Sequence, residues 1–110
     1  MDYGEHRWTE IADRVDRVVV LPLGSLEQHG HHLPLLTDSL ICREIVDRAQ
    51  AALGDLALFL PALRIGASEH HSRFPGTVSV GHETYIQMLD DMMESLIENG
   101  FTRILLLNAH

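Results

Sequence analysis

Three short apolar runs, separated by two longer amphipathic stretches, restrict the fold of this chain more than any other feature. The runs cover residues 18–23, 56–60 and 104–107. Between them, residues 37–52 and 83–98 carry apolar side chains at helical spacing. Continuous apolar runs are typical of strands that are buried on both faces. The order strand, helix, strand, helix, strand therefore predicts an α/β fold with a parallel sheet covered by helices.

Local signals mark the ends of the two helices. Thr37 or Asp38 can cap the first helix, and Gly54 follows its last turn, whereas Gly100 ends the second helix. Residues 77–80 add a short β-branched stretch after a Pro-Gly pair. The expected apolar faces are Leu40, Ile41, Ile45, Val46, Ala49 and Leu53 in the first helix, and Tyr85, Ile86, Leu89, Met92, Met93, Leu96 and Ile97 in the second.

The apolar run at residues 104–107 lies next to the end of the chain. A sheet that stopped there would expose an apolar edge strand, which favours aggregation. We therefore expect residues 1–110 to be the N-terminal portion of a single α/β domain in a longer protein. The alternative is a small domain that is completed by swapping or by oligomerisation.

Composition excludes several classes of function. The formal net charge is −8, and all eight basic residues are arginines without a basic run, which does not suit nucleic acid or an anionic membrane. No apolar run approaches the ~20 residues that span a bilayer, and the N-terminus lacks a signal-peptide core. Cys42 is the single cysteine and cannot form an internal disulfide. We expect a cytoplasmic protein.

Histidine-bearing segments follow all three predicted strands. Residues 24–30 contain Glu27 and His29, residues 66–71 contain His70 and His71, and the chain ends at His110. In an open α/β sheet, ligands bind beyond the carboxyl ends of the strands. Because the three segments would open on one edge of the sheet, a functional site there is our leading hypothesis.

The segment after the first strand predicts a metal site. Glu27 and His29 are two residues apart, so in an extended segment both side chains point the same way. Asp38 follows at the start of a helix. This mixture of oxygen and nitrogen donors suits zinc, manganese or iron, and not a thiolate-bound structural zinc. The simpler interpretations are that Asp38 only caps the helix and that Glu27 and His29 belong to a polar loop.

The same segments match the motifs of a known protein family. The first motif is Leu21-Pro22-Leu23-Gly24-Ser25-Leu26-Glu27-Gln28-His29-Gly30, followed by His32-Leu33-Pro34-Leu35 and Thr37-Asp38. The second is Gly66-Ala67-Ser68 through His71, then Phe74-Pro75-Gly76-Thr77, and the third is Leu105-Leu106-Leu107-Asn108-Ala109-His110. Together they resemble the signatures of the creatininase family from about residue 18 onward.

The resemblance implies a three-layer α/β/α (Rossmann-like) creatininase fold and a homo-oligomeric amidohydrolase. It implies that water activated by two divalent ions (Zn, Mn or Fe) hydrolyses a non-peptide or cyclic amide C–N bond of a small molecule. Carried over by position, it implies Glu27, His29, Asp38 and His110 as ligands, with Asp38 bridging the ions. It also implies that another ligating carboxylate and the acid/base histidine region lie beyond residue 110. His70 occupies a position where the family often has glutamate.

Four more residues receive predicted roles. His71 is the predicted catalytic histidine, facing the substrate or handling a proton, although a packed loop histidine explains it nearly as well. Gln28 and Asn108 are expected to hydrogen-bond the ligands, and Ser68 to lie near the substrate. A serine nucleophile is disfavoured because no nucleophile-elbow motif surrounds Ser68.

Three alternative functions remain open at this point. The chain could be a non-catalytic metal-binding or assembly domain, or a family member that processes a peptide in cofactor maturation. A nucleotide-binding module is the third, and it is disfavoured because Glu27 would lie where a phosphate-binding loop is needed.

Overall fold

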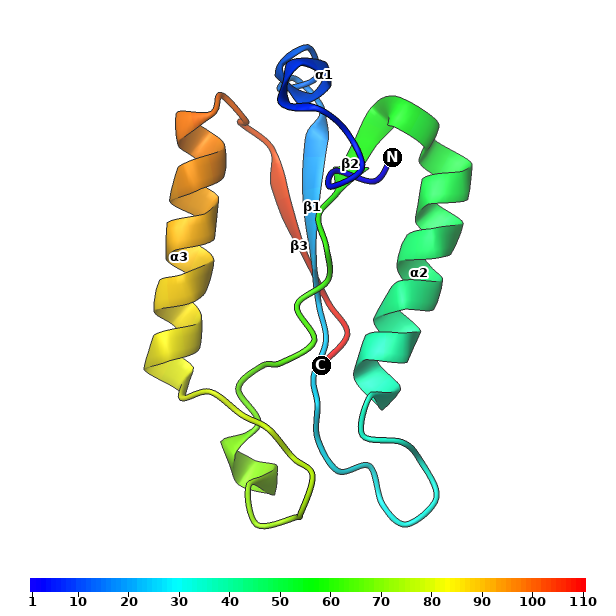
Figure 1. Cartoon of the computed structure of the whole chain (residues 1–110), viewed down its shortest axis with the longest axis vertical. Coiled ribbons are helices and arrows are strands. Elements are labelled where there is room, and N and C mark those ends of the chain that lie inside the picture. The colour runs from blue at the N-terminus through cyan, green and yellow to red at the C-terminus, as the bar shows by residue number, and fades with distance from the viewer.

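The computed structural model describes all of residues 1–110 and contains one parallel sheet of three strands (Figure 1). β1 (Val18–Leu23) lies between β2 (Ala57–Phe59) and β3 (Ile104–Asn108). Two long helices, α2 (Thr37–Leu53) and α3 (His82–Glu98), connect the strands. The predicted order of strands and helices is confirmed, and each helix is one residue longer than expected.

Three short elements complete the fold. α1 (Trp8–Ala12) was not expected from the polar N-terminus. The 3-10 turns η1 (Gly54–Leu56) and η2 (Glu69–His71) flank the β2 region. The β-branched stretch at residues 77–80 forms no strand and contributes one isolated bridge, between Val78 and Leu26. None of the helices is long and apolar enough to cross a membrane.

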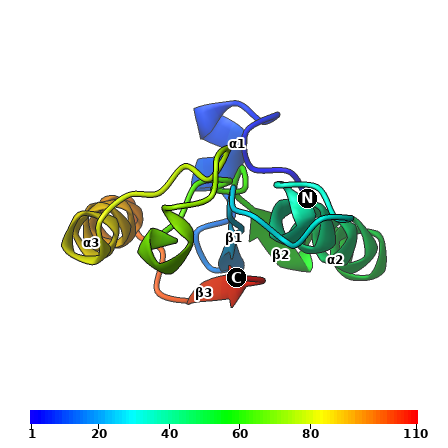
Figure 2. The ribbon, with the colours of Figure 1, turned by 90° about the horizontal axis from the view of Figure 1, so that it is seen from below.

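Alternate side chains of β1 pack on opposite faces of the sheet. Val19 belongs to a core cluster with Leu58 of β2 and Leu96 of α3, whereas Val20 belongs to another with Phe59, against which Val46 of α2 packs. α2 and α3 therefore cover opposite faces, as the end-on view shows (Figure 2). This is the expected three-layer α/β/α arrangement.

Several helix residues that were expected to face the core are exposed to solvent. Leu40, Ile41 and Ile45 of α2 are exposed, and the residues that α2 buries are Ser39 and Cys42. In α3, Leu96 is buried as expected, but Ile86 and Ile97 are exposed. The predicted core role of the exposed residues is wrong for this chain, because three strands are too narrow to cover the whole apolar width of either helix.

A close approach between β1 and α2 fixes the start of the helix. A Cβ atom at Gly24 would lie 2.5 Å from Ser39 Oγ and 2.8 Å from Ser39 Cα, so only glycine fits there. Ser39 Oγ donates a 2.8 Å hydrogen bond to the Ser25 carbonyl. The N-cap residue is Leu36, without a side-chain cap, so the predicted capping by Thr37 or Asp38 is wrong. The Asp38 carboxylate is instead directed toward β1.

Candidate metal centre

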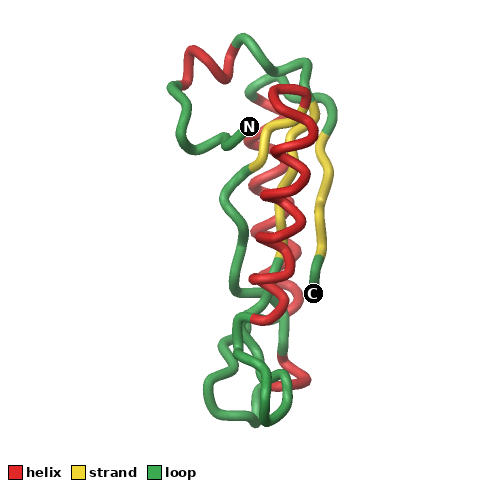
Figure 3. Tube along the Cα trace, turned by 90° about the vertical axis from the view of Figure 1, so that its right-hand side faces the viewer, coloured by secondary structure: helices red, strands yellow, loops and turns green.

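The loops after β1 and β2 lie together at one end of the molecule (Figure 3). This is the end at which the parallel strands present their carboxyl termini, and β3 also terminates toward it. The histidine-bearing segments therefore converge as the strand order predicts. Backbone bonds join the loops: the Gly24 amide donates to the Leu63 carbonyl, and the Val78 amide to the Leu26 carbonyl.

Glu27, His29 and Asp38 form the first candidate ligand set, with one ligand atom of each within 4.8 Å of the others. His29 Nε2 lies 3.0 Å from Asp38 Oδ1. Ser25 Oγ donates a 2.9 Å hydrogen bond to Asp38 Oδ2, which holds the carboxylate toward the histidine. Glu27 is only 4 % exposed, and its amide donates to the Leu35 carbonyl.

Both ring nitrogens of His29 face oxygen atoms. Nδ1 lies 3.1 Å from the Glu27 carbonyl, and this hydrogen bond is the main reason that the pKa of His29 is raised above its ordinary value. Burial opposes the rise, and Asp38 adds to it. A cation bound at Nε2 would take the place of a proton on that nitrogen, while Nδ1–H keeps donating to the Glu27 carbonyl. This arrangement is typical of metal-binding histidines.

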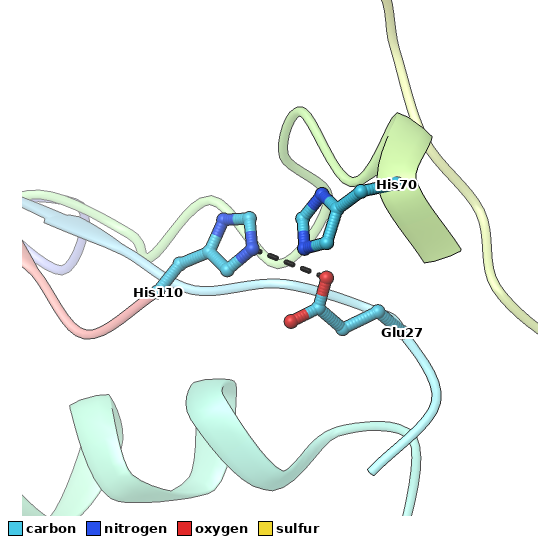
Figure 4. A group of neighbouring side chains, drawn as sticks. All are labelled: Glu27, His70 and His110. Atoms are coloured by element: carbon cyan, nitrogen blue, oxygen red, sulfur yellow. Dashed lines mark hydrogen bonds and ion pairs between the residues drawn. The ribbon is translucent and has the colours of Figure 1, made fainter. Parts of the chain in front are cut away.

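Glu27, His70 and His110 form the second candidate ligand set under the same 4.8 Å limit. Their side chains come from the loop after β1, from η2 and from the segment after β3, and they point toward one another (Figure 4). His110 Nε2 lies 3.1 Å from Glu27 Oε2. Glu27 is the residue that both sets share, whereas the resemblance gave the bridging role to Asp38.

His71, the predicted catalytic histidine, belongs to neither set. Gln28 Nε2 lies 2.7 Å from His71 Nδ1, and Gln28 Oε1 accepts a 2.9 Å bond from the Gly30 amide. The Gly30 contact orients the Gln28 amide group, so its N–H donates to His71 Nδ1. Gln28 thus contacts His71 and none of the predicted ligands.

Ser68 and Asn108 have separate environments. Ser68 is fully buried, its Oγ has no hydrogen-bond partner, and its amide donates to Ser79 Oγ. Asn108 Oδ1 accepts a 3.0 Å bond from the His110 amide. Asn108 therefore orients the backbone of a predicted ligand, and Ser68 lacks the adjacent base that a nucleophilic serine needs.

Of two cavities in the molecule, only one is lined by Gln28. A cavity of about 240 Å³ is lined by Gln28, Leu35 and Phe74 among others and lies beside the Gln28–His71 pair. A larger cavity of about 930 Å³ runs along α3 and Tyr3 and contains none of the ligand residues. The smaller cavity is not lined by a ligand residue either, and its link to the candidate site is Gln28, the hydrogen-bond partner of His71.

Comparison with known proteins identifies the family. The family model "Creatininase: Creatinine amidohydrolase" matches residues 4–110. The chain belongs to the creatininase family. It is 35% identical to the creatinine amidohydrolase of Pseudomonas putida over 115 residues, which cover 97% of this chain and 44% of that protein. The chain thus spans less than half the length of this curated relative.

The chain is also similar to a peptidase and to a solved creatininase structure. The mycofactocin precursor peptide peptidase of Mycobacterium tuberculosis is 44% identical over 79 residues, which cover 64% of this chain and 32% of the peptidase. A solved structure described as "Creatininase Mn" superposes with a TM-score of 0.89 at 35% identity, covering 99% of this chain and 45% of that one. The three-layer creatininase fold is therefore confirmed.

Sequence reasoning missed three residues of this creatininase-family site. Ser25 orients Asp38, and Ser39 ties α2 to the Ser25 carbonyl. Both serines look like ordinary small residues in sequence, and only the approach of α2 to β1 brings them into the site. His70 was noticed within a histidine cluster but received no role, because its distance from Glu27 and His110 depends on the path of the loop after β2.

Proposed function

We propose that the protein is a metal-dependent amidohydrolase of the creatininase type, which hydrolyses a non-peptide or cyclic amide C–N bond of a small molecule. The observation that carries this proposal is the pair of candidate ligand sets that share Glu27 at the carboxyl end of the sheet. The likeness to a creatinine amidohydrolase over nearly the whole chain supports the same reaction class.

The residues fit two divalent cations. Glu27, His29 and Asp38 would hold one ion, and Glu27 with His110 would contribute to the other. The donors are carboxylate oxygens and imidazole nitrogens without a thiolate, which suits zinc or manganese. When bound, such ions supply Lewis acidity that lowers the pKa of water and polarises a carbonyl oxygen.

His71, held by Gln28, is proposed to face the substrate. The Gln28 amide donates to His71 Nδ1, so a neutral His71 ring carries its proton on Nε2. His71 Nε2–H can then donate a hydrogen bond to the substrate, while the attacking water supplies the proton that the departing nitrogen takes up as the C–N bond breaks. Gln28 has the positioning role, because its amide fixes the tautomer of the ring.

A peptide C–N bond is the second candidate target. The observation that favours it is the 44% identity to a mycofactocin precursor peptide peptidase, which is higher than the identity to the creatinine amidohydrolase but extends over a shorter segment. The same metal and proton chemistry serves both bonds, so the distinction concerns the substrate and not the reaction type.

A hydrolysis assay tests the proposal directly. The intact protein, loaded with zinc or manganese, is incubated with creatinine and other cyclic amides in one series and with short peptides in another. We expect turnover of a cyclic or other non-peptide amide, its loss on chelation and its return when metal is added. Turnover of peptides alone would select the second candidate. Turnover that persists after complete removal of metal would overturn the proposal.

We also propose that the protein is a cytoplasmic homo-oligomer. Cys42 is buried and unpaired, which fits a reducing compartment. Apolar side chains are exposed on the edge strand β3 and on α2, where a second subunit could cover them.

A further inference from the structure

His70 has a position that a surface histidine does not need. It lies in η2, the 3-10 turn of the loop after β2, and its ring is stacked near that of His110 with centroids 6.1 Å apart and an interplanar angle of 12°. His70 makes no hydrogen bond or ion pair within the chain, although its neighbour His71 is bonded to Gln28. The nitrogen atoms of His70 are therefore free to accept another partner.

The surroundings of His70 favour a cation as that partner. The Glu27 carboxylate beside it is almost completely buried, and its hydrogen-bond partner is His110 Nε2. A buried carboxylate needs compensating positive charge. A nitrogen of His70, a nitrogen of His110 and an oxygen of Glu27 lie within 4.8 Å of one another, and all three side chains face the same point (Figure 4).

We infer that His70 is a ligand of the divalent cation held by Glu27 and His110. This inference rests on the proposed metal-dependent function and adds a ligand that neither the sequence motifs nor the family resemblance assigned. The set would then contain two imidazoles and one carboxylate, which are donor types that zinc takes.

The two ligand sets then differ in their preference for metals. The His70 set contributes two nitrogen donors and one carboxylate, whereas the His29 set contributes one nitrogen donor and two carboxylates. Imidazole favours zinc, and carboxylate tolerates manganese better. The position at His70 is therefore the zinc-selective one of the pair.

Metal binding by a His70→Ala variant of the intact protein tests this inference without an activity assay. Zinc affinity is measured by competition with a chromophoric chelator, and the visible spectrum is recorded after cobalt(II) substitution. We expect zinc affinity at one of the two positions to fall at least about tenfold, the lower end of what loss of a residue supporting a metal ligand costs. The cobalt d–d bands should change as one imidazole is lost.

Two further variants make the result specific. His31→Ala removes an exposed histidine that belongs to neither ligand set, and it should leave affinity and spectrum unchanged. His70→Glu restores an oxygen donor at the same place, so it should recover binding with a shift in preference from zinc toward manganese. If His70→Ala does not fold, His70→Glu alone still decides the question, because a ligand change must alter the cobalt spectrum.

The outcomes separate this inference from the proposed function. Native zinc affinity and an unchanged cobalt spectrum in both His70 variants would overturn the ligand role, even if the protein hydrolyses amides. Loss of one zinc position in His70→Ala would support the role even if no amide substrate is turned over, which would count against the proposed function alone.

Discussion

Glu27 is the side chain on which both candidate ligand sets depend. It is almost completely buried, and His110 is the one side chain bonded to its carboxylate. A buried carboxylate without sufficient positive charge costs several kcal/mol, of the order found for unpaired buried ions. Bound cations would supply that charge, so metal should stabilise the folded protein as well as serve its chemistry.

Ser25 offers a test of how the site is oriented. Ser25→Ala removes the hydroxyl that donates to Asp38 Oδ2, and the carboxylate becomes free to turn away from His29. We expect metal affinity at the Asp38 position to fall by about 10- to 100-fold, as for other residues that support a ligand. Titration with a competing chelator measures the change.

Ser95→Ala is the matched control for Ser25→Ala. Ser95 is exposed on α3 and belongs to neither ligand set, so its replacement should leave metal affinity unchanged. Equal affinities for Ser25→Ala and the native protein would show that the Asp38 carboxylate is oriented without the serine.

At the scale of elements, the junction between β1 and α2 carries the site. The loop after β1 delivers Glu27 and His29, and the first turn of α2 delivers Asp38. The two meet because Gly24 has no side chain and because Ser39 bonds to the Ser25 carbonyl. The distance between the carboxylates of Glu27 and Asp38 therefore depends on how closely Gly24 and Ser39 approach each other.

Gly24→Ala tests this junction. The added Cβ would lie 2.8 Å from Ser39 Cα, a backbone atom that cannot rotate away. We expect α2 to shift and the free energy of unfolding to fall by about 1–3 kcal/mol, as in other overpacked cores. Urea denaturation measures the loss, and metal affinity should fall with it.

Gly4→Ala controls for the general effect of replacing glycine. Its Cβ would meet Asp2 Oδ1 at 3.5 Å, an ordinary contact, so stability should change little. If Gly24→Ala were as stable as Gly4→Ala, the close approach of α2 to β1 would not be needed for folding.

At the scale of the whole molecule, β3 lies at one edge of the sheet and pairs only with β1. Leu105 and Leu106 in this strand are 51% and 39% exposed. An apolar strand with unpaired backbone groups is a template for association with another strand or surface. Together with the exposed apolar residues of α2, this strand gives the molecule more exposed apolar surface than a monomer usually carries.

We expect the protein to be an oligomer in solution and expect Leu105→Lys to reduce its assembly, because a charge on the edge strand opposes association. Light scattering after size-exclusion chromatography gives the mass of each form. Ile86→Lys, which places the same charge at an exposed position on α3, should keep the native mass. A monomeric native protein at micromolar concentration would contradict this prediction.

Local patterns were sufficient to predict the strands, the helices and their order. The runs that became β1 and β2 are buried in the structure, as continuous apolar runs predict, whereas the run that became β3 forms a strand but is largely exposed. Helical spacing identified α2 and α3. The rule that parallel strands open toward one edge then placed Glu27, His29 and Asp38 in one region, where the structure brings them together. Their roles as ligands stay a prediction.

Tertiary structure alone decided how the site is assembled. Capping of α2 by Thr37 or Asp38 was a local expectation, but the packing of Gly24 against Ser39 turns Asp38 toward Ser25 and His29. Likewise, the path of the loop after β2 brings His70 to Glu27 and leaves His71 with Gln28. Secondary structure follows from interactions between near neighbours in sequence, whereas contacts between loops depend on how the packed layers direct each chain segment.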